Sequence, residues 1–296
     1  MDVGRMRNGR SEEVAMVLQE QRQLVVALQA EGNSDLATEL GSLHADQQKS
    51  LLCADVYDAA KGVGVAPYGW SRGSADPDAL RAAGFKLTDD EFKELLRPDE
   101  SGFRAEIYLP DKSIHGPDAK PVVVFKGSAG EIIDPIAPGG LRSSMAEDFG
   151  NNAQQGLGLR SDYYDRAMRL ASHLNRINPD GFELAGHSLG GGMASAAAAV
   201  TGVQATTFNP AGLHPSTAKR FAEENGLPLH DPDTLVRGFR VHRDVLNDMQ
   251  EAVGRMPDSA RDEVEPVLRL LADAARQPRA RQWIAQALGP HMSEQE

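Results

Sequence analysis

The sequence has little of several residue types that define whole classes of protein. Only one of its 296 residues is a cysteine, Cys53, so the chain can form neither an intrachain disulfide nor a thiolate metal cluster. Positive charge is also scarce, because 31 Lys and Arg stand against 43 Asp and Glu and leave a net charge of −12. Nucleic acids and anionic membranes select basic surfaces, so we expect neither nucleic acid nor steady membrane adsorption.

Long apolar runs are missing as well. No stretch approaches the roughly 20 apolar residues needed to cross a bilayer, and residues 1–10 are polar and charged, unlike a signal peptide. We therefore expect a chain made in the cytoplasm with no transmembrane segment and no signal peptide. The histidines lack the spacing of metal ligands and no phosphate-binding glycine loop is present, so no metal or cofactor is predicted.

The hydrophobic patterns divide the chain into three parts. Residues 11–30 and 34–60 have helical periodicity and predict a helical N-terminal region over 1–65. A linker with a short helix is expected over 66–101, since residues 61–78 are rich in Gly, Pro and Ser. From residue 102 strands alternate with helices, which predicts an α/β domain over 102–296 with a mostly parallel central sheet.

The predicted elements of this domain follow from short apolar runs. Residues 103–109 alternate and predict a half-exposed strand, and continuous runs predict buried strands at 121–125, 182–185, 205–208 and 236–242. Helices are expected over 89–96 and 161–176 and directly after residue 188. The Gly/Pro-rich segment 127–152 contains an apolar island, Ile132–Ile136, that suits either a lid or a loop covering the core.

The most informative segment is Gly186-His187-Ser188-Leu189-Gly190. An apolar run leads into this Gly-x-Ser-x-Gly pattern, and a run of small residues follows it. This context is typical of a nucleophile elbow, a tight strand-to-helix turn that presents a serine hydroxyl. It predicts that Ser188 is the nucleophile of a serine hydrolase; the alternative is a glycine-rich turn in which Ser188 only caps a helix.

A serine nucleophile needs a base, and the base needs a carboxylate to orient it. In the α/β-hydrolase order, the acid and then the histidine follow the serine along the chain. Asp244 comes directly after the strand predicted over 236–242 and is the candidate acid; alternatively it is a solvated carboxylate paired with Arg243. His291 is the only later histidine and the candidate base, unless it is a frayed residue near the C-terminus.

Other residues compete for these two roles. Asp231 and Asp233 lie in a proline-rich turn before the strand, and Asp248 lies one helical turn beyond the candidate acid. His242 is the fallback base, whereas His187 lies inside the elbow and is expected to point away from the nucleophile. The remaining histidines are expected to be structural or exposed: His44, His115, His173, His214 and His230.

Acyl transfer also needs two N–H donors that face the developing oxyanion. Leu189, the residue after the serine, supplies one of them. The second is expected from the loop after the strand at 121–125, where Gly127 permits close approach of the backbone and Ser128 is the preferred donor. The alternative is an ordinary turn that ends the strand.

Several segments together resemble the class 3 lipase family of α/β-hydrolases over about residues 100–291. The elbow is similar almost residue for residue, and Lys126-Gly127-Ser128 resembles the family's Arg-Gly-Thr. Lys126 in place of arginine and Phe149 in place of tryptophan are departures from the family pattern. The segments that carry the resemblance are 123–128, 147–152, 186–191, 207–210 and 240–244.

A narrower similarity comes from Ala54–Tyr57, Asn151–Gly158 and Tyr163-Tyr164, which resemble the bacterial phospholipase effectors delivered by contact-dependent secretion systems. The family resemblance implies an α/β-hydrolase fold and hydrolysis of lipid esters through an acyl-enzyme. The narrower similarity implies a phospholipid substrate, secretion into target cells and a cognate immunity protein. Two other hypotheses stay open: a small-ester or thioester hydrolase, and a non-catalytic α/β-hydrolase that serves as a binding module.

Overall fold

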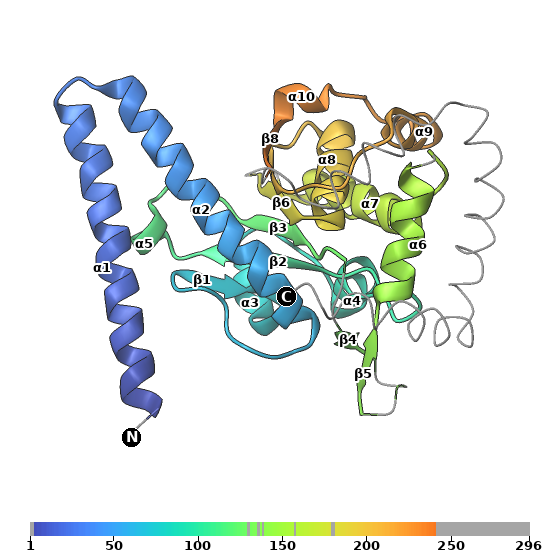
Figure 1. Cartoon of the computed structure of the whole chain (residues 1–296), viewed down its shortest axis with the longest axis horizontal. Helices are drawn as coiled ribbons and strands as arrows, with labels where there is room; N and C mark the ends of the chain where they lie inside the picture. The colour runs from blue at the N-terminus through green and yellow to red at the C-terminus, as the bar shows by residue number, and fades with distance from the viewer. Residues whose placement is uncertain are drawn as a thin grey trace.

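The chain folds around a six-stranded sheet with helices on both faces (Figure 1). The structure is a computed structural model that describes residues 3–240 apart from 129–130, 135–136, 138, 157 and 179–180. The strand order is β1-β2-β3-β6-β7-β8, in which β3, β6, β7 and β8 are parallel and β1 and β2 are antiparallel. The strands span Trp70–Arg72 (β1), Ala105–Pro110 (β2), Val122–Phe125 (β3), Glu183–His187 (β6), Ala205–Phe208 (β7) and Val236–Phe239 (β8). This architecture confirms the prediction of an α/β fold with a mostly parallel central sheet.

Helices and a small hairpin complete the described part of the chain. The hairpin pairs β4 (Glu131–Ile133) with β5 (Leu141–Ser143) and projects from the body (Figure 1). None of the described helices has both the length and the apolar character needed to span a membrane. The helices are α1 (Val3–Ala30), α2 (Ser34–Ala60), α3 (Pro77–Ala82), α4 (Asp89–Leu96), α5 (Lys112–His115), α6 (Met145–Gly156), α7 (Asp162–Ile177), α8 (Leu189–Thr201), α9 (Pro215–Asn225) and α10 (Pro232–Leu235), with a 3-10 turn at Gly73–Ala75.

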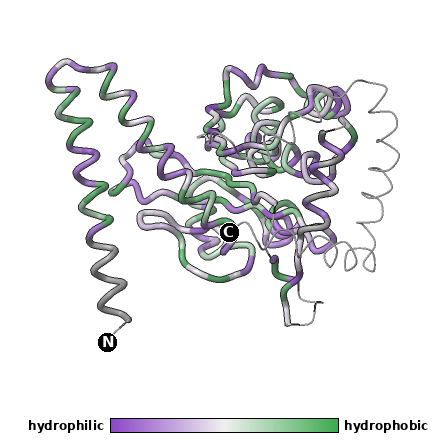
Figure 2. The backbone as a smooth tube through the Cα atoms, viewed as in Figure 1, coloured by the Kyte–Doolittle hydropathy of each residue, from purple (hydrophilic) through white to green (hydrophobic). Residues whose placement is uncertain are grey.

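The alternation of side chains along β3 explains how the sheet is buried on both faces. Val122 and Val124 face α2 and join a core cluster with Leu52 and Val56. Phe125, like Val123, faces the other side and joins the larger core under α7 and α8. All four residues of β3 are buried, as a continuous apolar run predicts. In Figure 2, the hydrophobic colour of the backbone tube is concentrated in the central strands.

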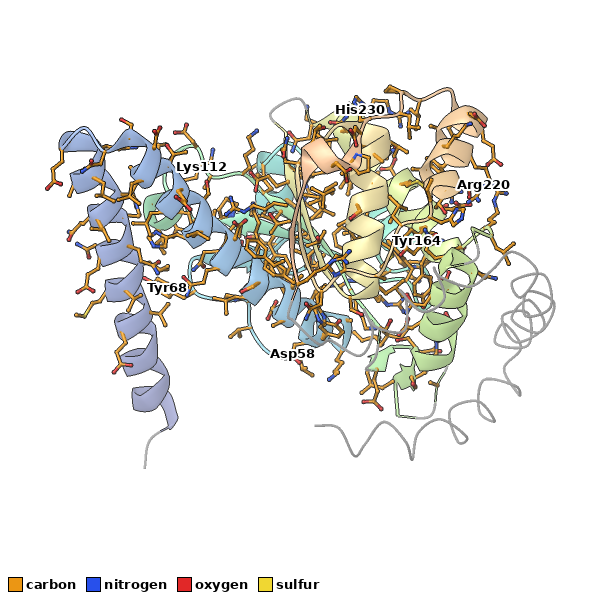
Figure 3. The ribbon with its side chains drawn as sticks, turned by 45° about the horizontal axis from the view of Figure 1, so that its top comes forward. Asp58, Tyr68, Lys112, Tyr164, Arg220 and His230 are labelled. Atoms are coloured by element: carbon orange, nitrogen blue, oxygen red, sulfur yellow. The ribbon has the colours of Figure 1, made fainter. Side chains whose placement is uncertain are left out.

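Helix α8 packs close to the sheet because its residues are small. Most of its residues from Leu189 to Val200 are buried, and they are mainly Gly and Ala. Tyr164 of α7, labelled in Figure 3, lies so close to Gly192 that a methyl group there would collide with the phenol oxygen. Small residues on α8 therefore set the distance between the sheet and the helix layer that covers it.

Two local expectations were wrong. Strand β2 is buried rather than half-exposed, because its polar side chains are paired inside the protein: Glu106 accepts hydrogen bonds from Arg97 and Ser74. The loops expected over 61–78 and 127–152 contain β1, the β4–β5 hairpin and α6. The strands β1, β4 and β5 have three residues each, too few to show a period in the sequence, whereas α6 is a helix of 12 residues within a segment rich in glycine.

Helix α2 is tied to the antiparallel edge of the sheet by a buried carboxylate. Asp55 accepts two hydrogen bonds from the Arg72 guanidinium, at 2.9 and 2.7 Å, and a third from the Tyr108 hydroxyl at 2.7 Å. Burial, followed by the neighbouring Asp55 charge, raises the pKa of Tyr108, so the phenol remains the donor. The three groups satisfy one another inside the protein, where unpaired partners are costly.

This network predicts a large stability effect. Replacing Asp55 with alanine leaves Arg72 and Tyr108 without their acceptor, and we expect the free energy of unfolding to fall by about 3–5 kcal/mol. Asp58→Ala, one turn further along α2 at an exposed position, is the matched control and should change it by less than about 0.5 kcal/mol. Urea denaturation measures both; equal effects of the two variants would contradict the role given to Asp55.

Candidate functional site

Ser188 occupies a sharp turn between β6 and α8. Its φ of 57° and ψ of −127° lie in a region that side-chain-bearing residues rarely adopt, at a cost of about 1–3 kcal/mol. The surrounding backbone holds the turn in place. Ser188 N–H donates to Phe208 O at 3.0 Å, and Ser188 O accepts from Ala211 N–H at 2.8 Å. Such strain, maintained by neighbouring segments, is typical of functional positions.

Glycines allow three backbone segments to meet at this turn. A methyl group on Gly186 would collide with the Gly190 carbonyl, and one on Gly190 would collide with the Phe125 carbonyl. At Gly127, a methyl group would collide with His187 O and lie 3.3 Å from Ser188 Cβ. The loop after β3 therefore passes in direct contact with the elbow, as its glycine predicts.

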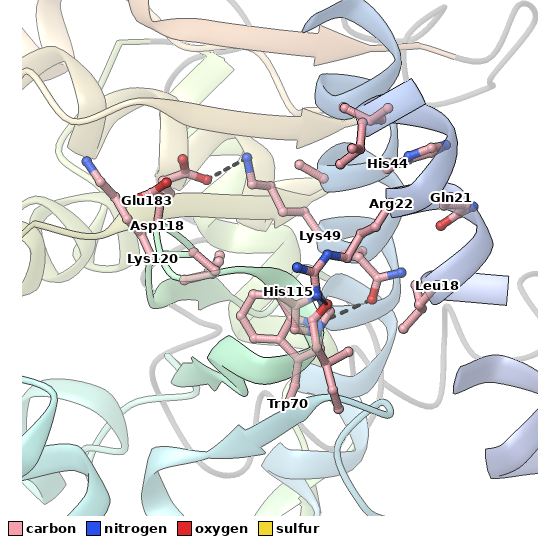
Figure 4. A pocket seen from close by; sticks show the side chains of 18 residues that line it. Leu18, Gln21, Arg22, His44, Lys49, Trp70, His115, Asp118, Lys120 and Glu183 are labelled. Carbon is pink, nitrogen blue, oxygen red and sulfur yellow. Dashed lines mark hydrogen bonds and ion pairs between the residues drawn. The ribbon is translucent and has the colours of Figure 1, made fainter. Parts of the chain in front are cut away.

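Ser188 lies at the carboxyl edge of the parallel strands, and 8% of its surface is exposed. A cavity between α1, α2 and the sheet lies elsewhere (Figure 4), with a volume of about 410 Å³. Its lining includes Arg22, Lys49 and the first residues of β3 and β6, Val122 and Glu183. Because Ser188 follows the last residue of β6, this cavity lies at the opposite edge of the sheet from the candidate nucleophile.

The candidate oxyanion donors flank Ser188. Leu189 is the first residue of α8, where a backbone N–H has no partner within the helix. Ser128 follows the glycine of the β3 loop, and its hydroxyl oxygen accepts a hydrogen bond from Asn152 of α6 at 3.0 Å. Two loops that are far apart in sequence thus bring backbone amides to the same edge of the sheet.

The buried side chain of Lys126 contacts the loop that follows β3. Lys126, only 3% exposed, donates to the carbonyl oxygen of Gly127 at 3.1 Å and to Ser144 Oγ at 3.0 Å. Ser144 in turn donates to Asp148 Oδ2 at 2.8 Å, and this carboxylate lies 3.7 Å from Lys126 Nζ. Burial lowers the pKa of Lys126, and the Asp148 charge opposes that shift.

Tyr57 connects α2 to the elbow from the other side. Its hydroxyl lies 3.2 Å from Nδ1 of His187 and packs against Gly127, where a methyl group would collide with the phenol oxygen. Burial raises the pKa of this phenol, so it is protonated near neutral pH and able to donate to His187. The contact gives His187 a partner on α2, in keeping with the structural role expected for it.

The candidate acid and base lie outside the residues that the structure describes. Asp244, His291 and their competitors His242 and Asp248 all follow Arg240, the last described residue. Strand β8 ends at Phe239, whose carbonyl accepts from Asn209 N–H at 2.7 Å. Because β6, β7 and β8 are parallel, the chain leaves β8 at the same edge that carries Ser188.

Sequence reasoning gave no role to several residues that surround the elbow. Tyr57 and Asp148 belong to segments that carry the family resemblance, but neither pattern indicates what those side chains contact. Ser144 has no sequence signal at all, since a single serine before a helix is common. Among the residues that the structure describes, no cluster of three or more His, Cys, Asp or Glu side chains could hold a metal ion.

Comparison with known proteins assigns the chain to a family. An extracellular phospholipase A1 of Serratia liquefaciens is 29% identical over 225 residues, which cover 74% of this chain and 58% of that relative. The chain thus matches little more than half of the relative's length. A protein family described as a Tle-like phospholipase domain matches residues 48–288, from the middle of α2 to beyond the last described strand. The match covers most of the chain, which therefore belongs to the Tle-like phospholipase family.

Proposed function

We propose that this protein hydrolyses carboxylic esters of phospholipids, with Ser188 as the nucleophile. The observation that carries the proposal is the positive φ of Ser188 between β6 and α8, in contact with the Gly127 loop. A nucleophile elbow needs this strand–turn–helix context. The phospholipase family and the name of the Serratia relative support a lipid ester as the substrate.

We further propose Asp244 and His291 as the other members of a Ser-His-Asp triad. Asp244 follows the last residue of β8, Phe239, by five positions, a span of at most about 18 Å in an extended chain. This position after a strand that ends at the Ser188 edge supports the acid role. His291 is supported by its place in the chain after the acid, the order found in α/β-hydrolases.

The reaction proceeds through an acyl-enzyme. His291 removes the proton as Ser188 Oγ attacks the ester carbonyl carbon, and the N–H groups of Leu189 and Ser128 bind the oxyanion. The carbon–oxygen bond to the lysophospholipid then breaks, and His291 returns the proton to the leaving oxygen. Water, deprotonated by His291, attacks the acyl-enzyme; a fatty acid leaves and Ser188 is regenerated. Because Gly127 has no side chain, the loop that carries the Ser128 N–H can approach Ser188 closely.

The proposed architecture is an α/β-hydrolase domain over 102–296, preceded by a helical region at 1–65 and a linker segment at 66–101. Support comes from four parallel strands with the elbow at their carboxyl edge. Within this domain, the β4–β5 hairpin is a candidate lid or acyl-contact surface. Ile133, 40% exposed, lies so close to Gly62 that a methyl group there would be 2.8 Å from Ile133 Cδ1.

The first prediction concerns the nucleophile. Ser188→Ala should reduce fatty-acid release from phospholipid vesicles by at least about 10³-fold, because no acyl-enzyme can form. Ser195→Ala is the matched control on the same helix; its hydroxyl donates to the Gly191 carbonyl within α8, and the rate should not change. Labelling by a fluorophosphonate probe reports the same difference.

Other outcomes would support the rival hypotheses. Equal fatty-acid release by wild type and Ser188→Ala would refute the proposed chemistry. Rapid cleavage of short nitrophenyl esters without hydrolysis of vesicles would favour a small-ester or thioester hydrolase. No labelling of wild type by the probe and no ester cleavage would favour a binding module.

The second prediction concerns the triad. Asp244→Asn should lower kcat by about 10⁴-fold, because the histidine loses the carboxylate that fixes its tautomer. His291→Ala should have a comparable effect and should also suppress fluorophosphonate labelling of Ser188. Steady-state kinetics on vesicles measures both variants. Loss of activity in His242→Ala but not in His291→Ala would assign the base to the other histidine.

We also propose an antibacterial role, in which a contact-dependent secretion system delivers the protein to target cells and a cognate immunity protein protects the producer. The family match supports this role. Wild-type protein directed to the periplasm of a bacterial host should then stop growth and raise free fatty acid, whereas Ser188→Ala should do neither. Growth inhibition that persists in Ser188→Ala would separate toxicity from ester hydrolysis.

A further inference from the structure

We propose that Lys126 is a positioning residue for the oxyanion hole, which fixes the orientation of the peptide between Gly127 and Ser128. This inference rests on the proposed function and deepens it. The key contact is the hydrogen bond from Lys126 Nζ to the Gly127 carbonyl oxygen, at 3.1 Å. A peptide unit is planar and trans, so its C=O and N–H groups point in opposite directions. Holding the Gly127 carbonyl on the Lys126 side therefore directs the Ser128 N–H to the other side of the loop.

Gly127 also contacts a different element. The Tyr57 hydroxyl, which comes from α2, lies against Gly127, where a methyl group would collide with the phenol oxygen. Gly127 itself cannot supply rigidity, because it lacks a side chain and its backbone has the widest conformational range. The Tyr57 hydroxyl packed against Gly127 and the hydrogen bond from Lys126 to the Gly127 carbonyl thus replace the stiffness that the glycine lacks.

The lysine is in turn held on several sides. Ser144 Oγ accepts a hydrogen bond from Lys126 Nζ at 3.0 Å and donates one to Asp148. Lys126 Nζ also lies 5.5 Å from the centre of the Tyr57 ring. A buried ammonium is costly unless charge and hydrogen-bond acceptors surround it. The presence of Asp148 at 3.7 Å meets that need. Ser144, Asp148 and Tyr57 therefore fix the charged Nζ of Lys126 against the loop that follows β3.

The identity of the residue matters for this role. An ammonium is a compact point charge with three donors, whereas a guanidinium is a planar fork of fixed geometry. Lysine can direct one N–H to the Gly127 carbonyl and another to Ser144 from a single nitrogen. Lys126 stands where the class 3 lipase pattern has arginine, and Ser144 and Asp148 supply the acceptor and the negative charge that its ammonium needs.

Kinetics of Lys126→Met test the inference, because methionine keeps the length of the side chain and removes its donors and charge. We expect kcat on phospholipid vesicles to fall by about 10²–10³-fold, the effect of losing one oxyanion donor, with little change in KM. Lys126→Arg should recover part of this loss. Lys49→Met is the matched control: this lysine also pairs with a carboxylate, Glu183, but at the far edge of the sheet, and kcat should not change.

Inhibition by a long-chain alkyl boronic acid provides a readout that a purely structural role would not move. The boronate forms a tetrahedral adduct with Ser188 and places an anionic oxygen in the oxyanion hole, whereas a non-hydrolysable ether phospholipid does not. Lys126→Met should weaken boronate inhibition by a factor similar to the loss in kcat and leave binding of the ether lipid unchanged. If Lys126→Met does not fold, Ser144→Ala, which frees one contact of Nζ, should give a smaller loss in the same direction.

Two results would overturn the inference. A folded Lys126→Met enzyme with wild-type kcat and boronate affinity would show that the lysine only fills space. Equal weakening of the boronate and the ether lipid would assign it to general packing. If wild type itself binds no boronate and releases no fatty acid, the proposed function fails and the inference fails with it.

Discussion

The candidate site depends on the close approach of three backbone segments where β6 turns into α8. The turn places Ser188 at a φ of 57°, and the glycines before and after it leave room for the end of β3 and the Gly127 loop. A single side-chain carbon at 127, 186 or 190 would force these segments apart. Hydrogen bonds between Ser188 and the backbone of Phe208 and Ala211 hold the turn in a geometry that the backbone alone would not favour.

Helix α2 shows that the site is not confined to the strands and loops around Ser188. The helix covers one face of the sheet, and its last turns bring Tyr57 to the elbow while Asp55 binds Arg72 and Tyr108. One helix therefore carries both a structural ion pair and a contact to the Gly127 loop. The family match begins at residue 48 and so includes the part of α2 that carries Asp55 and Tyr57.

The sequence allowed prediction of those features that repeat locally. The continuous valine run of β3, the Gly-x-Ser-x-Gly turn and the helical periodicity of α2 and α7 each correspond to an element of the structure. Short elements such as β1 and β5 were missed because three residues define no period. The burial of Glu106 was missed for another reason: its partners Arg97 and Ser74 are brought near by tertiary structure, and a polar residue in an alternating strand normally faces water. The same holds for Ser144, whose importance depends on where Lys126 points.

The contact between Tyr57 and His187 joins residues 130 positions apart in sequence. A ribosome delivers the N-terminal helices long before it delivers the elbow, at roughly 5–20 residues per second. The nascent chain consequently carries α2 before His187 is synthesised, and the contact between Tyr57 and His187 forms only after β6 has emerged. Assembly of the candidate site is thereby postponed to a late stage of synthesis, when most of the polypeptide is already available to fold around it.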